Sequence, residues 1–593
     1  MASATPDPLD ATAPAVVTEG LAVTVRKVRT RATPASQLPE NLSPLLRRIY
    51  AARHVQHGGE LVTGLEALLP VGSLENVHEA AALLLRHAEG RVLIVGDFDA
   101  DGATSTALMM HALTAWGFRS VDFLVPDRFR FGYGLTPGIV AEAGRFAPSL
   151  IVTVDNGISS IEGVAAARAA GIDVLVTDHH LPGEQLPQAN VIVNPNMPGS
   201  GFGSRALAGV GVAFYVLAAL QRALQTAARW PAGARPVAQW LDLVALGTVA
   251  DLVPLDANNR VLVAQGLRRI QARQCVPGLL ALLDVARRDS ASVIATDLGY
   301  AVGPRLNAAG RLDDMSIGIR CLLAADGAAA GALATQLDGL NSQRREIQAD
   351  MQAQAQAAVK GLGAWQDGGR HAGLCLFDAA WHQGVVGLVA SRIKDCTARP
   401  VVAFAPAGDG TELRGSARSI AGVHVRDVLD SVATRYPGLV KRFGGHAMAA
   451  GLSIDHLDLD RFARAFDAAV AERLALVESD DAVWTDGELA DAEISLTTAQ
   501  LLREAGPWGQ AFPEPSFEGE FEVESPRVVG EKHVKCWLRP VGSQARFDAI
   551  AFNLLDGERF ATPPQGRVRL AYRLDINHWQ GERRLQLLIE HVE

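Results

Sequence analysis

The sequence has 593 residues, which at the usual domain size predicts three or four domains rather than one. With 48% hydrophobic and 20% charged residues, the composition is typical of a globular protein. The net charge of −10 counts against a protein that coats nucleic acid without regard to sequence, but it allows an enzyme whose basic residues line one groove.

Cysteine usage and hydropathy favour the cytoplasm. The five cysteines are scattered and form no CxxC pair, which argues against a disulfide framework or a zinc ribbon. No stretch reaches the roughly 18 uninterrupted apolar residues of a membrane span. The N-terminus lacks the basic start and apolar core of a signal peptide. We therefore expect a cytoplasmic protein that does not bind membranes.

The first 40 residues differ in pattern from the region that follows. Residues 1–40 are rich in Ala, Pro, Thr and Asp and lack periodicity, which predicts a disordered tail. Within residues 41–323, short apolar runs alternate with helical stretches, as in a mostly parallel sheet covered on both faces. We expect strands at 91–96, 121–125, 150–154, 174–177 and 191–193, and helices at 104–116, 161–170, 206–224 and 240–249.

The rest of the chain predicts three further parts. Residues 324–365, rich in Ala and Gln, predict a long exposed helix that connects two domains. Residues 366–475 repeat the α/β pattern and predict a smaller accessory domain. Residues 476–593 contain short strand-like runs separated by turns, which favours a small β-barrel of the oligonucleotide-binding (OB) kind. The expected fold class is therefore α/β with a C-terminal OB-like barrel.

Four short polar clusters lie where strands of the first domain are expected to end. Three of them directly follow a predicted strand: GDFDADG at 96–102, VDNG at 154–157 and TDHH at 177–180. The fourth is GTVAD at 247–251. Ligands of open α/β sheets bind beyond the carboxyl ends of the strands, so we expect these side chains to converge on one crevice.

The ligand types in these clusters indicate hard divalent cations. Carboxylates and imidazole without thiolate suit Mn²⁺ or Mg²⁺. Each cluster alone is weak, since isolated aspartates more often cap turns and adjacent histidines more often have structural roles. Together they place several carboxylates near apolar strands, where burial without compensation would be costly. A pair of cations would compensate them and would suit phosphodiester hydrolysis, although aminopeptidases also use two metals.

In this order the clusters resemble the motifs of the DHH family of phosphoesterases. GPRLNAAGRL at 303–312 and the helix containing LNSQRR resemble the RecJ branch of that family. RGSARSI at 414–420 and FGGHAMAAG at 443–451 resemble its accessory domain. The resemblance covers roughly residues 45–590. It implies a metal-dependent exonuclease that degrades single-stranded DNA in the 5′→3′ direction during recombination and repair.

The resemblance also implies roles for individual side chains around the metals. Among the catalytic candidates, His180 would lie beside the scissile phosphate, where it stabilises charge or acts as an acid. Asp178 would orient a histidine, while Asp101 is either linked to the metal or forms a turn. The implied ligands of one or two Mn²⁺ or Mg²⁺ ions, with two ions expected, are Asp97, Asp99, Asp155, His179 and Asp251.

A second set of residues resembles those that hold the DNA strand. Ser416 and Arg418 would bind the 5′ phosphate, since a serine beside glycine and an arginine can supply a hydroxyl, backbone amides and a forked donor. The neighbouring glycines of a second motif would let backbone amides approach a phosphate closely. The remaining candidates for substrate binding are Gly444, Gly445 and His446, and, for weaker contacts to the DNA backbone, Arg128 and Arg311.

The barrel region favours single-stranded DNA as the substrate. Basic residues outnumber acidic ones between positions 527 and 584, as in folds that bind unpaired bases. A helicase and a single-strand-binding protein are candidate partners. Aromatic residues at strand spacing are more often barrel core than stacking platforms, which leaves both roles open for Trp537, Phe547, Phe552, Tyr572 and Trp579.

Two other functions fit part of the sequence. One is a DHH enzyme that acts on a small substrate, such as an oligoribonuclease, a cyclic-dinucleotide phosphodiesterase or a pyrophosphatase. Such relatives are generally shorter and lack the terminal barrel. The other is a binding module without catalysis, which predicts broken metal motifs, whereas all of the acidic positions are present here.

Overall fold

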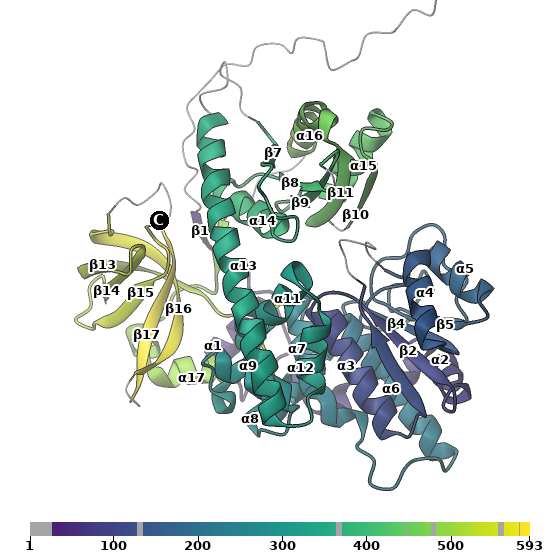
Figure 1. Cartoon of the computed structure of the whole chain (residues 1–593). Helices are drawn as coiled ribbons and strands as arrows, with labels where there is room; N and C mark the ends of the chain where they lie inside the picture. The colour runs from purple at the N-terminus through teal and green to yellow at the C-terminus, as the bar shows by residue number, and fades with distance from the viewer. Residues whose placement is uncertain are drawn as a thin grey trace, which may run out of the picture.

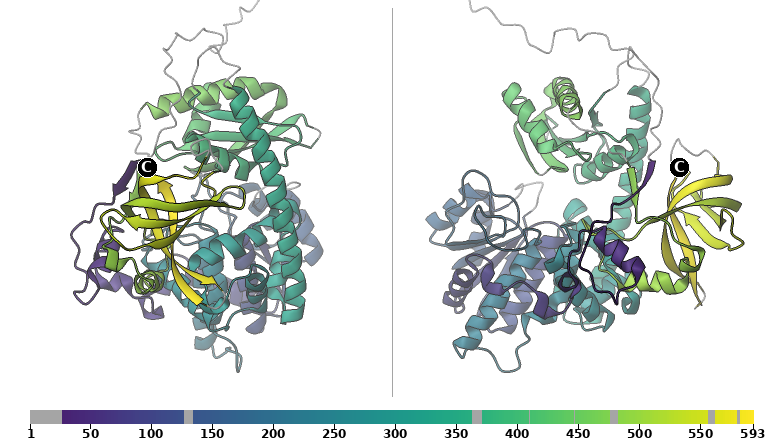
Figure 2. Two further views of the ribbon diagram at one scale, coloured as in Figure 1. Left: turned by 90° about the vertical axis from the view of Figure 1, so that its left-hand side faces the viewer. Right: turned by 180° about the vertical axis from the view of Figure 1, so that it is seen from behind.

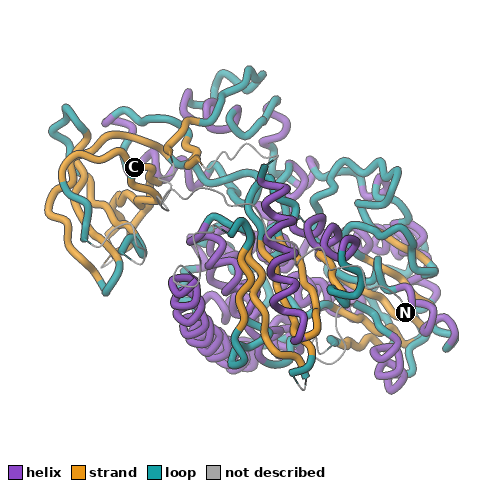
Figure 3. The backbone as a smooth tube through the Cα atoms, turned by 90° about the horizontal axis from the view of Figure 1, so that it is seen from above, coloured by secondary structure: helices purple, strands orange, loops and turns teal. Residues whose placement is uncertain are grey.

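The computed structural model describes residues 27–126, 134–362, 371–408, 410–445, 447–475, 482–555, 562–579 and 582–593. The chain forms a first domain, an accessory domain and a barrel (Figure 1). Helix α13 (Gly327–Leu362) runs from the first domain to the accessory domain, as the views in Figure 2 also show. Seen from above, the strands of the three parts form separate groups (Figure 3). In the described part of the chain, no helix has the length and apolar character needed to cross a membrane.

The first domain is built on a parallel five-stranded sheet, as predicted. Its strand order is β3-β2-β4-β5-β6, so the direction of strand addition reverses between β2 and β4. This reversal is a topological switch point, where open α/β sheets bind ligands. The strands are β2 (Arg91–Gly96), β3 (Ser120–Leu124), β4 (Leu150–Val154), β5 (Asp173–Thr177) and β6 (Val191–Val193).

Helices cover both faces of this sheet. Consecutive residues of the same strand, such as Ile94 and Val95 of β2, belong to different hydrophobic cores. One core contains α3 (Ala100–Ala115) and α6 (Gly209–Thr226), and the other contains α4 (Pro137–Ala143) and α5 (Ile161–Ala169). The other main helices of this domain are α1 (Pro44–Ala51), α2 (Val77–Arg86), α7 (Leu241–Ala250), α8 (Ala257–Gln271), α9 (Pro277–Val285), α11 (Gly303–Leu312) and α12 (Ser316–Leu323).

The accessory domain has a mixed sheet with a hydrophobic core on each face. The strand order is β10-β11-β9-β8-β7, in which only β7 and β8 are parallel. One core contains α15 and α16, and the other joins α14 to the end of α13. The elements are β7 (Leu374–Phe377), α14 (Val386–Thr397), β8 (Val401–Ala407), β9 (Glu412–Arg418), α15 (Val425–Arg435), β10 (Arg442–Gly445), β11 (Ala449–Asp455) and α16 (Leu459–Leu474).

The predicted five-stranded barrel is confirmed, and it packs on the first domain. Arg53 of the first domain and Asp486 of the barrel region form a buried pair, with 2.8 Å between Nη1 and Oδ1. The ring of Tyr50 stacks on Trp508 and Phe512. Helix α17 (Leu496–Glu504) precedes the barrel, whose strands are β13 (Phe517–Val529), β14 (His533–Pro540), β15 (Phe547–Ala551), β16 (Gly566–Trp579) and β17 (Glu582–Val592).

Residues 27–40, which we expected in the disordered tail, contain ordered structure instead. Strand β1 (Lys27–Thr30) pairs in parallel with β12 (Ala482–Thr485), and Val28 is buried. The physical reason is that β12 supplies backbone partners for this segment from more than 450 residues away in the sequence. The composition of residues 27–40 alone cannot reveal a strand partner so far away in the sequence.

Candidate functional site

Two aspartates follow neighbouring strands at the switch point of the first sheet. Asp97 follows β2 and Asp155 follows β4, and both are buried. Asp155 adopts a left-handed backbone conformation with φ of +62°, and its N–H donates to the Thr177 carbonyl at 3.0 Å. Such a conformation is costly for a residue other than glycine and tends to persist at functional sites. The left-handed conformation of Asp155 turns the chain sharply at the end of β4.

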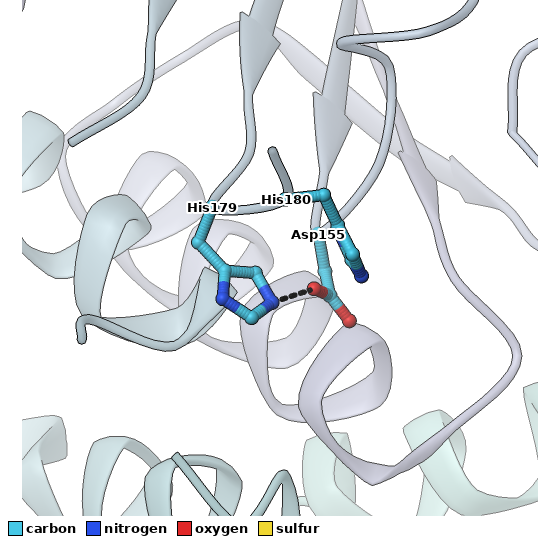
Figure 4. Close-up of side chains that lie close together, drawn as sticks. All are labelled: Asp155, His179 and His180. Carbon is cyan, nitrogen blue, oxygen red and sulfur yellow. Dashed lines mark ion pairs between the residues drawn. The ribbon is translucent and has the colours of Figure 1, made fainter. Parts of the chain in front are cut away.

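His179 joins these aspartates from the end of β5. Its Nε2 lies 3.1 Å from Oδ1 of Asp155 and 3.5 Å from Oδ2 of Asp251. Figure 4 shows His179 pointing at Asp155, with His180 beside the same carboxylate. Ligand atoms within 4.8 Å of one another form three overlapping groups, which are Asp97–Asp99–Asp155, Asp155–His179–His180 and Asp101–His179–Asp251.

Asp251 reaches this site from a helix. The residue is the C-cap of α7, and its N–H donates to the Gly247 carbonyl at 2.9 Å. We expected a helix at 240–249, and α7 (Leu241–Ala250) confirms it. The cluster at 247–251 therefore lies at the end of a helix and not, as we also expected, where a strand ends. The last turn of α7 points at the same crevice as the strand ends, so the side chain converges with the others all the same.

Asp99 and Asp101 also hold the helices around the site. Asp99 caps the N-terminus of α3, where its Oδ1 accepts from the N–H groups of Asp101 and Gly102 at 3.0 and 3.1 Å. Asp101 is fully buried and accepts from the N–H groups of Gly209 and Val210, at 2.6 and 2.9 Å, in the first turn of α6. Each carboxylate has further lone pairs that can meet a cation.

The negative charges of these carboxylates repel one another. Burial, and then the nearby carboxylates of Asp101 and Asp99, raise the pKa of Asp155 well above its ordinary value. The pKa of Asp251 is raised in the same way, and that of Asp101 is raised to about 7 by burial and by Asp99. Among the described residues, none donates a hydrogen bond to the buried Oδ2 of Asp251. Carboxylate oxygens and imidazole nitrogens of this kind are suitable metal ligands for Mn²⁺ or Mg²⁺.

His180 has a different partner from His179. Its Nδ1 lies 2.7 Å from Oδ1 of Asp178, which also accepts from the backbone N–H groups of both histidines. The other oxygen of Asp178 accepts from Ile158 N at 2.9 Å. Burial alone would lower the pKa of His180, but the hydrogen bond with Asp178 and the surrounding carboxylates raise it to about 9. Asp178 therefore fixes the orientation of the His180 ring.

Glycines allow the helices to approach the acidic loops closely. A Cβ at Gly102 would lie 2.6 Å from the Asp97 carbonyl oxygen, and one at Gly209 would lie 2.6 Å from the Asp155 Cβ. Both distances are below the 3.0 Å that real Cβ atoms respect. We did not predict a role for Gly209 from the sequence, since a glycine at the start of a helix is a common feature with no particular link to a site.

Helix α11 supports the loop that carries Asp97 and Asp99, which we call the metal loop. Oδ1 of Asn307 accepts from Ala100 N at 2.8 Å. Gly310 lies so close to the Phe98 carbonyl that a Cβ there would clash with it. The motif at 303–312 therefore holds the metal loop in place, a function for Asn307 that sequence reasoning missed although the motif itself had been singled out.

The predicted phosphate-binding residues lie on the accessory sheet beside the first turn of α14. Arg418 Nη1 donates to Ser416 Oγ at 2.9 Å and to the Ala417 carbonyl at 2.8 Å. A Cβ at Gly387, the second residue of α14, would lie 2.9 Å from both Ser416 Oγ and Arg418 Nη2. We call Ser416, Arg418 and Gly387 the phosphate clamp. Helix N-termini favour anions, so the N-terminus of α14 would add to the attraction of the phosphate clamp for a phosphate group.

Only some of the other residues predicted to contact DNA lie near the phosphate clamp. Gly444 on β10 and Ser416 on β9 both pair with Gly451 of the strand between them, and Gly445 is the last residue of β10. Nη1 of Arg311 donates to the Gly384 carbonyl of the accessory domain at 3.3 Å. Arg128 and His446 lie outside the described residues.

The aromatic residues of the barrel divide between core and surface. Tyr572 is buried in the barrel, so a stacking role for it is wrong. Trp537 and Phe552 are 47% and 58% exposed, and Lys535 lies on the same strand and face as Trp537. The structure does not describe the side chain of Trp579.

Three family domains match the chain in order. They are the DHH family N-terminal domain over residues 91–248, the DHHA1 domain over 368–472 and the RecJ OB domain over 485–591. The chain is 52% identical to the single-stranded-DNA-specific exonuclease RecJ of Dickeya dadantii, over 96% of this chain and 99% of that protein. It is 50% identical to the protein of that name from Escherichia coli, over 94% and 97%.

Solved structures give the same relationship. RecJ from Thermus thermophilus in complex with Mn²⁺ superposes with a TM-score of 0.75 at 30% identity, over 93% of this chain and 76% of that one. Its complex with Mg²⁺ superposes with a TM-score of 0.71 at 28% identity, over 93% and 75%.

Proposed function

The chain belongs to the RecJ family of DHH phosphoesterases, and we propose that it is a metal-dependent exonuclease that hydrolyses phosphodiester bonds of single-stranded DNA. It acts in the 5′→3′ direction, in DNA recombination and repair. The observation that carries this proposal is the set of three overlapping groups of side chains that could bind metal ions, at the switch point of the first sheet. The alternative of a non-catalytic module loses its support because the acidic positions converge.

The metal-binding residues are Asp97, Asp99, Asp155, His179 and Asp251. Two divalent cations, Mn²⁺ or Mg²⁺, would activate a water molecule and stabilise the leaving oxygen when bound there. The protein's own contribution is a buried, preorganised set of carboxylates. Asp101 supports this set by tying the first turns of α3 and α6 together.

His180 meets the scissile phosphate in this proposal. Asp178 holds Nδ1 of the ring at 2.7 Å, so Nε2 is the atom that can face the substrate. A hydrogen-bond donor fixed in this way stabilises charge that develops on a phosphate oxygen or passes a proton to the leaving group. Asp178 acts on the reaction through His180.

The phosphate clamp recognises the 5′ end of the strand. Its hydroxyl, guanidinium and helix N-terminus together suit a terminal phosphate, which carries more charge than a phosphate within the chain. The clamp lies on a different domain from the metals, so a strand held in it meets the metals at a fixed number of bonds from its end. This arrangement favours an exonuclease over an endonuclease.

The barrel holds the unpaired part of the strand. Trp537 offers an exposed ring for stacking. Lys535, two residues away on the same strand, pairs with Asp548, with 3.2 Å between Nζ and Oδ2. Duplex DNA hides its bases, so this surface favours single strands. The barrel also counts against the alternative of a very small substrate, which would not reach it.

We also infer the setting in which the enzyme acts. A helicase would supply single strands, and a single-strand-binding protein would coat them, so both are proposed partners. The cytoplasm is the proposed compartment.

One assay tests the core of this proposal. Single- and double-stranded DNA, labelled at either end, is incubated with Mn²⁺, Mg²⁺ or a chelator, and the products are resolved over time. We expect short products from the 5′ end of single strands, and only with metal. Cleavage within the strand, or equal cleavage of duplex DNA, would contradict the proposal.

A further inference from the structure

The metal loop and the phosphate clamp are connected through one continuous set of close contacts. On the first domain, Gly310 and Asn307 of α11 hold the loop that carries Asp97 and Asp99. The next residue of α11, Arg311, contacts the accessory domain at Gly384. The connection therefore begins at the metal ligands and crosses between the domains at Arg311.

The contact at Gly384 is unusually tight. Arg311 Nη1 donates to the Gly384 carbonyl at 3.3 Å, while the Arg311 carbonyl faces the Cα of Gly384. A Cβ at Gly384 would lie well under 3.0 Å from that carbonyl oxygen, and the obstacle is backbone rather than a flexible side chain. Gly384 is buried, and its φ lies outside the left-handed region. The close approach, rather than the backbone conformation, therefore requires glycine here.

The same loop continues directly into the clamp. His382 Nδ1 accepts from Gly384 N at 3.1 Å, and its carbonyl accepts from Val385 N at 2.9 Å. These bonds fold the loop into the start of α14, where Gly387 touches Ser416 and Arg418. The residue that contacts α11, Gly384, and the residue that contacts Ser416 and Arg418, Gly387, are therefore only three positions apart in the chain.

Apolar packing makes this connection rigid. Leu312, at the end of α11, packs against the accessory core that contains Trp381 and Val385. Nε1 of Trp381 donates to Gln354 of α13 at 2.8 Å. The loop from 381 to 385 is thus held by α11, α13 and α14 together, and a shift at Gly384 would be passed on to the clamp.

We propose that Gly384 is a positioning residue that fixes the separation between the phosphate clamp and the metals. The inference rests on the proposed exonuclease function. It goes further because it assigns the spacing between the two sites to one glycine and its contact with Arg311. A strand whose 5′ phosphate occupies the clamp then presents its scissile bond to the metals in one register.

Gly384→Ala tests this inference. The methyl group has to move the loop away from α11 by about 1 Å, and a misplacement of that size can cost about 10²-fold in rate. We expect kcat on 5′-phosphorylated single strands to fall about 10²-fold while KM stays within about threefold, because the clamp itself is intact. Strands with a 5′-hydroxyl, which cannot fill the clamp, should lose much less.

Two measurements separate positioning from damage. Gly339→Ala is the matched control, since a Cβ at Gly339 of α13 meets nothing within 4 Å. Thermal unfolding and calorimetric titration with Mn²⁺ report whether the fold and the metal site survive. Unchanged kcat in Gly384→Ala would overturn the inference, as would an equal loss on both kinds of strand.

Arg311→Met provides a second variant in case Gly384→Ala does not fold. It removes the donor to the Gly384 carbonyl without introducing a clash. A loss of kcat confined to 5′-phosphorylated strands supports the inference, whereas a rise in KM on both kinds of strand assigns Arg311 to DNA binding and overturns it. If the wild-type protein does not degrade single strands at all, the proposed function itself fails, which is a different result from either of these.

Discussion

Nδ1 of His180 lies 2.7 Å from Oδ1 of Asp178, only two residues earlier in the chain. The neighbouring ring of His179 turns instead toward Asp155 and Asp251. Two consecutive histidines therefore have different partners, one set suited to binding metal and the other to orienting a ring. This difference is the basis for assigning them different roles.

His180→Ala should lower kcat about 10²–10³-fold, since removing one preorganised donor to developing charge typically has that effect. Its affinity for Mn²⁺, measured by isothermal titration calorimetry, should stay close to that of the wild type. His179→Ala is the matched variant and should weaken metal binding. If His180→Ala loses a metal ion, His180 is itself a ligand and the assigned role is wrong.

Asp155→Ala should abolish hydrolysis and leave DNA binding largely intact, because it removes a metal ligand and not a contact with the strand. Hydrolysis is followed on end-labelled single strands in excess Mn²⁺, and binding by fluorescence anisotropy. Asp173→Ala is a suitable control, since Asp173 is the first residue of β5 and lies at the opposite end of the parallel strands from the site. Near-normal turnover by a folded Asp155→Ala protein would refute the metal assignment.

The first sheet could be predicted closely from the sequence. Buried parallel strands are continuous apolar runs, so β2, β4 and β6 have the bounds we expected. The motifs at the ends of β2, β4 and β5 could be found for the same reason. The direction in which Asp251 points could not be predicted, because the sequence does not show where the last turn of α7 lies in space.

Contacts between distant segments could not be predicted. Whether Gly384 is needed depends on how closely α11 approaches it, and no local pattern records that distance. Likewise, β1 is ordered only because β12 lies beside it. The composition of residues 27–40 is that of a tail, and tertiary pairing overrides it.

The buried pair of Arg53 and Asp486 should be important for the attachment of the barrel. Both side chains are at most 1% exposed, and Nε of Arg53 also donates to the Pro513 carbonyl at 2.7 Å. Arg53→Met leaves the buried carboxylate of Asp486 with only its longer pair to Arg31, 3.3 Å between Nη1 and Oδ2. Removing one partner of a buried ion pair typically costs up to about 3–5 kcal/mol. Urea unfolding measures this loss.

The exposed pair of Arg435 and Glu472 serves as the control for that measurement. Exposed pairs contribute roughly 0–1 kcal/mol, so Arg435→Ala should change the free energy of unfolding very little. Equal losses in the two variants would show that burial of the Arg53 pair has no special effect.

Trp537→Ala should weaken binding of long single strands. Stacking of one base on an aromatic ring is worth about 1–3 kcal/mol, so the Kd should rise by roughly one to two orders of magnitude. Strands too short to reach the barrel should be cleaved as by the wild type. Trp484→Ala, which removes another exposed tryptophan on β12, is the comparison. A similar effect of both variants would remove the argument for stacking on the barrel.

The last prediction concerns the direction of degradation. The phosphate clamp and the metal site lie on different domains, so a strand must meet both for the reaction to proceed in register. If the clamp binds a terminal 5′ phosphate, a strand without a nearby end cannot fill it. Direction then follows from geometry, and Arg418 is the residue whose charge should read the end.

Arg418→Ala should therefore reduce kcat/KM on 5′-phosphorylated strands far more than on 5′-hydroxyl strands. A charged hydrogen bond of this type is worth about 1.5–3 kcal/mol, or roughly one to two orders of magnitude in specificity. Arg435→Ala, an arginine on the exposed surface of the same domain, should leave the preference unchanged. An equal loss on both kinds of strand would mean that Arg418 binds the DNA backbone at any position. The 5′→3′ direction would then need another source, because a contact that does not distinguish an end cannot select one.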